Sequence, residues 1–147
     1  MSYEAGLLQS FFNQKLKLEL TGYIVKGDNM IITVPMQGLQ NAGKVNNKGI
    51  EFAANANPVK NLGLNLTYSF INMESPVYAT PKHHLFLSCD YRLKNWFLTA
   101  SVQYVNHLDT DPSTKVSFQN YTLLNSKVSC QVWKFTELFI SAENVLN

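Results

Sequence analysis

Three histidines are the residues of this chain best suited to hold a metal ion or a haem. His83 and His84 are adjacent, and His107 follows further along the chain. Imidazole is a common metal ligand. Adjacent residues of a strand point to opposite faces, so two ligands on one face need an even separation. The pair therefore predicts two structural histidines at a strand end and no metal or haem site.

A second candidate is the acidic stretch Asp109-Thr110-Asp111, which could offer oxygen ligands to Ca²⁺. The two carboxylates would share one face if the backbone is extended. Calcium takes six to eight oxygen ligands, and this stretch supplies too few. We expect a solvated loop here and assign no metal ligands.

Charged residues recur at alternating positions of apolar-polar stretches, where they would share one polar face: Lys17, Glu19, Glu51, Asp90 and Arg92. Cross-strand charge pairs are ordinary on such a face. No serine lies within the glycine pattern of a nucleophile elbow, and no nucleophile, base and orienting group share a recognisable spacing. We expect no enzyme, assign no catalytic residue, and identify neither a cofactor nor residues that would bind one.

The elements that must position these residues are strands. In 62–72, apolar and polar residues alternate from Leu62 to Phe70, and 46–56 repeats the pattern from Gly49 to Ala56. The segment 57–61 between them, Asn-Pro-Val-Lys-Asn, has turn chemistry because Pro fixes φ and Asn tolerates left-handed conformations. Each arm is as long as one tilted bilayer crossing, roughly 9 to 11 residues. The sequence predicts a hairpin of membrane type.

The same pattern continues through the chain and predicts an all-β fold, an antiparallel up-and-down meander of about eight strands in one unit, 1–147. The strands are expected at 3–12, 16–26, 46–56, 62–72, 82–93, 96–106, 118–132 and 137–143. One face should carry Leu64, Leu66, Leu85, Leu87, Leu98, Ala100 and Val102. The other face should carry Asn65, Thr67, Ser88, Asp90, Thr99, Ser101 and Gln103.

Connections between these strands alternate in length. Short turns follow the odd-numbered strands, whereas the even-numbered ones are followed by the long connections 27–43, 73–80 and 107–117. The apolar patch 31–34 is expected to extend the second strand beyond a bulge. Short turns on one rim and long loops on the other are typical of outer-membrane barrels. Aromatic residues near strand ends favour interfacial girdles, and they are Tyr23, Tyr68, Phe70, Tyr91, Trp96, Tyr104 and Trp133.

Composition excludes other classes. Charged residues make up 15% of the chain, below the roughly 25% of soluble domains, and no apolar run approaches the about 20 residues of a transmembrane helix. The net charge of +2 comes from scattered residues without a basic cluster or an aromatic platform, so nucleic acid is not an expected partner. The start of the chain lacks signal-peptide features, which indicates a cytoplasmic protein or a missing beginning.

Four segments together resemble the C-terminal part of the β-barrel of TonB-dependent outer-membrane receptors. They are Tyr3-Glu4-Ala5-Gly6-Leu7, Asn47-Lys48-Gly49-Ile50-Glu51, Pro81-Lys82-His83-His84-Leu85 and Ser141-Ala142-Glu143-Asn144-Val145-Leu146-Asn147. The family's barrel has about 22 strands around a plug, so the resemblance implies a segment without plug or final strand. It also implies a Gram-negative outer-membrane location and three partners: membrane lipid, the rest of the barrel and plug, and the TonB system acting through the plug.

Two functions remain open from the sequence. The first is part of the transmembrane barrel of a receptor that imports a scarce nutrient such as an iron chelate, haem, cobalamin or a glycan. The alternative is a soluble or small self-contained β-barrel that binds an apolar ligand. Few lysines and glutamates lie on the polar face, which disfavours a solvated outer surface. Alone, the chain is expected to show no catalysis, no energy-coupled uptake and little ligand affinity.

Overall fold

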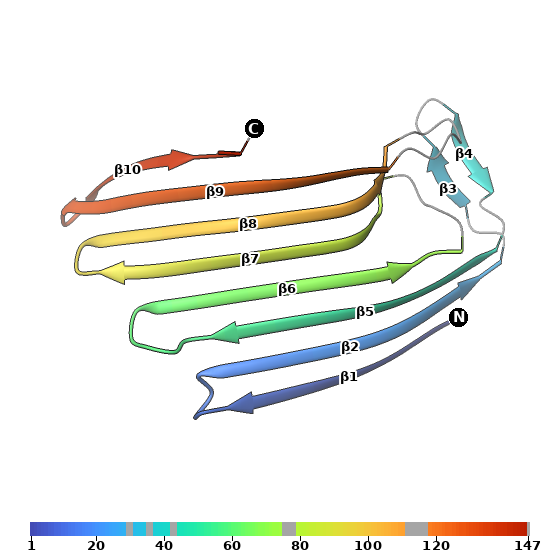
Figure 1. Ribbon diagram of the computed structural model, residues 1–147, viewed down its shortest axis with the longest axis horizontal. Helices are drawn as coiled ribbons and strands as arrows, with labels where there is room; N and C mark the ends of the chain where they lie inside the picture. Colours follow the sequence, from blue (N-terminus) through green and yellow to red (C-terminus); the bar gives the residue numbers. More distant parts are fainter. Residues whose placement is uncertain (29–30, 35–36, 42–43, 75–78, 111–117, 147) are drawn as a thin grey trace.

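The fold is a single antiparallel sheet. The computed structural model describes residues 1–28, 31–34, 37–41, 44–74, 79–110 and 118–146. Eight strands follow the order β1-β2-β5-β6-β7-β8-β9-β10, so each pairs with its neighbour along the chain (Figure 1). They are β1 Ser2–Phe11, β2 Leu16–Gly27, β5 Val45–Ala56, β6 Leu62–Asn72, β7 Pro81–Leu93, β8 Trp96–Asp109, β9 Phe118–Trp133 and β10 Thr136–Ala142. The predicted all-β meander is confirmed.

The first long connection contains a hairpin that the sequence did not predict. Strands β3 (Ile31–Val34) and β4 (Gly38–Asn41) pair with each other in a separate two-stranded sheet. The expectation that 31–34 would extend β2 is wrong. Gly27, the last residue of β2, lies opposite Val45, the first residue of β5. No partner strand reaches further, so the patch pairs within its own connection.

Strand boundaries differ from the prediction mainly at turns and at one bulge. Phe12 was expected in the first strand, but Phe12, Asn13 and Gln14 have φ values of 53°, 55° and 68° and form the turn. Strand β8 runs to Asp109 and so takes in the first residues of the expected loop 107–117. The register between β8 and β9 shifts between Val105 and Leu108, because the bulge absorbs one residue and lets pairing resume.

The register separates the two predicted faces. Leu66 lies opposite Ala54 on one side and Leu87 on the other, while its neighbour Thr67 lies opposite Ala53 and Phe86. Residues directly opposite each other in a ladder share a face. Both predicted sets are confirmed, because the alternation holds through Cys89–Ala100 and Ser88–Ser101 into β8.

The sheet has almost no core. Among the described residues, Val105 is the one buried hydrophobic residue, and every residue of β1 and β10 is exposed. Strands β1 and β10 do not pair with each other, so the sheet is open. An uncovered apolar face on this scale is unfavourable in water. The apolar face therefore requires a non-aqueous environment, and the open sheet gives no support to a self-contained soluble barrel.

Within the same described ranges, no helix is long and apolar enough to cross a membrane.

A charge placed on each face should separate their environments. Leu66→Arg should destabilise the membrane-embedded chain by about 2–4 kcal/mol, the cost of a cation on a lipid-facing strand near mid-bilayer. The matched change Thr67→Arg, one position away on the other face, should cost far less. Urea unfolding in lipid vesicles measures both, and equal costs would show that the assigned faces are wrong.

The two cysteines provide a check on strand order. Cys89 lies opposite Ala100, and Cys130 lies opposite Trp96, so β8 separates them as predicted. Their backbones are about 10 Å apart across the strands alone, beyond the roughly 7 Å limit for a disulfide. Both thiols should react with a thiol reagent in denaturant without reductant. A monomer with no titratable thiol would contradict this strand order.

Candidate functional site

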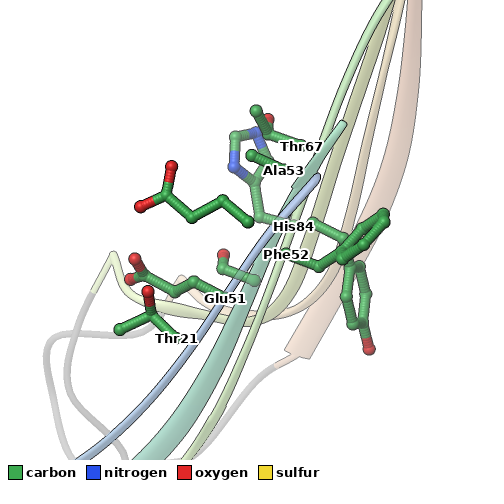
Figure 2. A pocket seen from close by; sticks show the side chains of 9 residues that line it. Thr21, Glu51, Phe52, Ala53, Thr67 and His84 are labelled. Carbon is green, nitrogen blue, oxygen red and sulfur yellow. The ribbon is translucent and has the colours of Figure 1, made fainter. Parts of the chain in front are cut away.

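The polar face carries a hollow of about 230 Å³ near the middle of the sheet (Figure 2). Strands β2, β5, β6 and β7 each contribute to it, so four consecutive strands of the ladder position its side chains. The lining residues are Glu19, Thr21, Glu51, Phe52, Ala53, Thr67, Tyr68, Ser69 and His84. In Figure 2 the side chain of Phe52 points to the opposite side of the sheet from those of Glu51 and His84.

Two rows of cross-strand neighbours build the polar lining. Thr21 faces Glu51, Glu51 faces Ser69, and Ser69 faces His84. In the adjacent row, Glu19 faces Ala53. Glu19 and Glu51 are therefore diagonal neighbours, with about 7–8 Å between their Cα atoms. The ladder register alone brings these two carboxylates together.

The hollow has a negative character. Two carboxylates line it, and no lysine or arginine does. His84 lies at its edge, with its Nε2 atom 3.1 Å from Nε2 of Gln103. Two nearby carboxylates without a cation between them repel each other and attract a positive charge. The arrangement suits a guanidinium or ammonium group supplied from outside this sheet.

The other charged residues expected on this face lie on it but apart from the hollow. Lys17 faces Asn55, Asp90 faces Thr99, and Arg92 lies with its Cζ 5.6 Å from the ring centre of Phe97. Between described residues, the one ion pair joins Lys127 to Glu137 at 3.9 Å. Of the five residues singled out in the sequence, this hollow thus takes in only Glu19 and Glu51.

Adjacent histidines point to opposite faces, as predicted. His83 faces Phe70 and Asn106 on the apolar side, and its Nδ1 is 2.9 Å from the hydroxyl of Tyr68. Its ring centre is 5.0 Å from that of Phe70. His84 lies on the polar side, at the hollow. A shared metal site for this pair is geometrically excluded.

His107 and the acidic stretch meet at the bulge near the end of β8. His107 has a φ of 54°, and its backbone N–H donates to Oδ1 of Asn120 at 2.8 Å. Asp109 is buried, and its carbonyl oxygen accepts from the N–H of Ala79 at 3.0 Å. Asp111 lies outside the described residues. In the described part of the chain, no three His, Cys, Asp or Glu residues gather as a metal site would require.

Tyr23 does not belong to the expected girdle of interfacial aromatic residues. It was counted among the interfacial aromatics, but it lies on the polar face directly opposite Gly49. A Cβ atom added to Gly49 would overlap the ring of Tyr23. Gly49 is buried beneath that ring, which gives a packing reason for glycine in Asn47-Lys48-Gly49-Ile50-Glu51. The signal was present in the sequence, because Tyr23 alternates in phase with Glu19 and Thr21.

These features define a class of protein. An open antiparallel meander of membrane-crossing strands, with one apolar face, one polar face and no core, is a segment of the wall of a transmembrane β-barrel. The model of one family, the TonB-dependent receptor-like β-barrel, matches residues 1–145. The chain belongs to this family, which is a family of receptors.

Solved structures share the fold. The ferric yersiniabactin uptake receptor FyuA from Yersinia pestis matches with a TM-score of 0.81 and 16% identity, over 99% of this chain and 24% of its own. The ferric-catecholate import receptor Fiu from K12 E. coli matches with a TM-score of 0.74 and 15% identity, over 99% of this chain and 23% of the receptor. The ferric preacinetobactin receptor BauA from Acinetobacter baumannii matches with a TM-score of 0.74 and 16% identity, over 99% of this chain and 25% of the receptor.

This chain therefore spans about a quarter of the length of those receptors. Comparison with curated protein sequences finds no match.

The contact between Tyr23 and Gly49 can be tested with a double-mutant cycle. Gly49→Ala should destabilise the folded chain by about 1–3 kcal/mol, because the new methyl group displaces the tyrosine ring. In a Tyr23→Ala background, the same change should cost much less, which gives a coupling of at least about 0.5 kcal/mol. Urea unfolding in detergent micelles measures all four proteins. Strictly additive costs would show that ring and glycine do not touch.

Proposed function

We propose that this chain forms part of the barrel wall of a TonB-dependent receptor that imports a scarce nutrient across the outer membrane. One observation carries the proposal: an eight-stranded sheet with almost no core has one apolar face and one polar face. Family membership over residues 1–145 supports it. The lipid of the outer membrane is the partner of the apolar face.

For the nutrient we propose an iron chelate. The structures with the same fold include receptors named for ferric yersiniabactin, ferric catecholate and ferric preacinetobactin. Their identity to this chain is low, so their names support the class of substrate and not a particular siderophore. Haem, cobalamin and glycans are the other nutrients that the same receptor architecture would accommodate.

We further propose that the hollow on the polar face contacts a plug. A plug that fills the lumen would meet this face, and Glu19 and Glu51 would accept a basic side chain from it. Strands β1 and β10 would pair with the rest of the barrel, since each has one unpaired edge. Energy from the TonB system would reach such a receptor through the plug.

A purified chain tests this function directly. It should require detergent for solubility, show β-sheet circular dichroism in micelles and aggregate when detergent is removed, because unpaired edges and an apolar face are exposed in water. A stable monomer in plain buffer with a small apolar ligand bound would overturn the proposal and favour the soluble alternative.

The same preparation should not bind substrate tightly. A binding site spread over the loops of a whole barrel and its plug would be incomplete here, and ordering the isolated loops costs conformational entropy. Titration with ferric catecholate, haem and cobalamin should give no submicromolar affinity. Submicromolar binding that survives scrambling of the polar face would contradict this prediction.

A further inference from the structure

The four short turns of the sheet share a charge pattern. Each contains one lysine and none contains a carboxylate, although the chain has 10 acidic residues. The turns are 12–15, 57–61, 94–95 and 134–135, and their lysines are Lys15, Lys60, Lys94 and Lys134. All four lysines are exposed. We call the set of these four turns the basic rim.

The turns of the basic rim lie in a row along one end of the sheet, at the left in Figure 1. Backbone hydrogen bonds join each turn to the adjoining hairpin: the N–H of Asn57 donates to the carbonyl of Lys15 at 2.7 Å, that of Arg92 to Asn61 at 2.9 Å, and that of Gln131 to Asn95 at 2.9 Å. One turn follows every two strands, so the lysines repeat at intervals of about 10 Å. Residues far apart in the sequence thus form one continuous basic edge.

Among the described residues, the cations at this edge have few counter-charges. The ion pair between Lys127 and Glu137 includes none of the four lysines. A hollow of about 550 Å³ at the rim brings Lys15, Lys60 and Arg92 together with a single carboxylate, that of Asp90. The opposite end of the sheet also carries lysines, but its described residues include the carboxylates of Asp28, Glu74 and Asp109.

Exposed aromatic residues accompany the lysines. Phe12 is 75% exposed and Phe135 is 90% exposed, and both lie in turns of the basic rim. The two tryptophans of the chain, Trp96 and Trp133, flank the turns and are 49% and 77% exposed. Trp and Tyr concentrate where a membrane surface meets water, so the rim lies at the level of lipid headgroups.

The tryptophans lie on the apolar face. Trp96 pairs with Cys130 and Leu93 on the apolar face. Trp133 reaches the same face through a bulge in β9. On β10, Glu137 pairs with Gln131 on the polar face, so the preceding residue, Thr136, lies on the apolar face. Trp133 pairs with Thr136 and therefore shares that face. A bulge of this kind re-aims the side chains beyond it. Both indoles therefore stand beside the lysines on the side of the sheet that contacts the membrane.

We propose that the basic rim binds anionic phospholipid headgroups in the membrane leaflet that surrounds the short turns. The inference rests on the proposed function, because it requires the sheet to sit in a bilayer. Cationic side chains attract an anionic lipid surface, and the indole rings fix the depth at which the lysines meet the phosphates. The regular spacing lets several headgroups bind side by side along the rim.

Intrinsic tryptophan fluorescence tests this proposal. Both tryptophans of the chain lie at the rim, so their emission reports on the surroundings of the rim alone. The full chain is reconstituted into equal mixtures of phosphatidylcholine and phosphatidylglycerol, with bromine on the acyl chains of one lipid at a time. Brominated phosphatidylglycerol should quench the emission several-fold more effectively than brominated phosphatidylcholine. The ratio of the two quenching efficiencies should fall toward unity at about 1 M salt, where the Debye length is about 3 Å.

A matched pair of variants locates the effect. The rim variant Lys15→Gln, Lys60→Gln, Lys94→Gln and Lys134→Gln should lose the preference, since each lysine near an anionic surface contributes on the order of fivefold. The control variant Lys26→Gln, Lys44→Gln, Lys48→Gln and Lys82→Gln removes the same charge near the long connections and should retain it. Circular dichroism in micelles verifies that both variants fold.

Each outcome is decisive. Equal quenching by both lipids in the unmodified chain overturns the inference but leaves membrane insertion intact. Equal loss of preference in both variants overturns the assignment to the rim. A rim variant that keeps the full preference shows that the four lysines do not bind the headgroups and overturns the inference, and an acidic protein segment would then be the partner to seek for the rim. Absence of quenching by either lipid would instead overturn the proposed function.

Discussion

Backbone hydrogen bonding in a medium without water is the constraint on which this structure depends. In hydrocarbon, each unpaired N–H or C=O group costs several kcal/mol, and a strand can satisfy these groups only through its neighbours. Strands β2 and β5 to β9 are paired on both sides, whereas β1 and β10 are paired on one. Side chains need not form a core, because the ladder supplies the cohesion. Because backbone pairing and not side-chain packing holds the strands together, the sheet buries only Val105 among its described hydrophobic residues.

The sequence predicted the sheet well because the alternation of strands is a local property. The alternation of neighbouring residues alone assigns Leu66 and Thr67 to opposite faces, and the strand pairing in the structure places them there. The same alternation places Tyr23 in phase with Glu19 on the polar face, so its position near a strand end does not make it an interfacial aromatic residue. The hairpin β3–β4 was not predicted for a different reason, since a four-residue segment with three apolar residues fits either a new strand or the extension of the preceding one.

Features that depend on the relative register of strands were beyond prediction. The sequence placed five charged residues on one face, but only the pairing of β2 with β5 shows that Glu19 and Glu51 are diagonal neighbours. The bulge that turns Trp133 to the apolar face has no signature in the local pattern. The basic rim was invisible for a similar reason. Its lysines are scattered along the chain and form no contiguous basic run, and the repeated hairpin brings them to one edge.

The neighbour-to-neighbour pairing order has a consequence for how such proteins change over evolutionary time. Since no strand crosses another, a hairpin forms contacts with only two others and resembles a link in a one-dimensional array. Gaining or losing one such link would alter the circumference of a closed wall by about 10 Å and would leave the remaining ladders in register. The excursion that contains β3 and β4 shows that a connection can hold a whole hairpin while β2 and β5 stay paired. Pore size and loop architecture can therefore diversify independently in this fold.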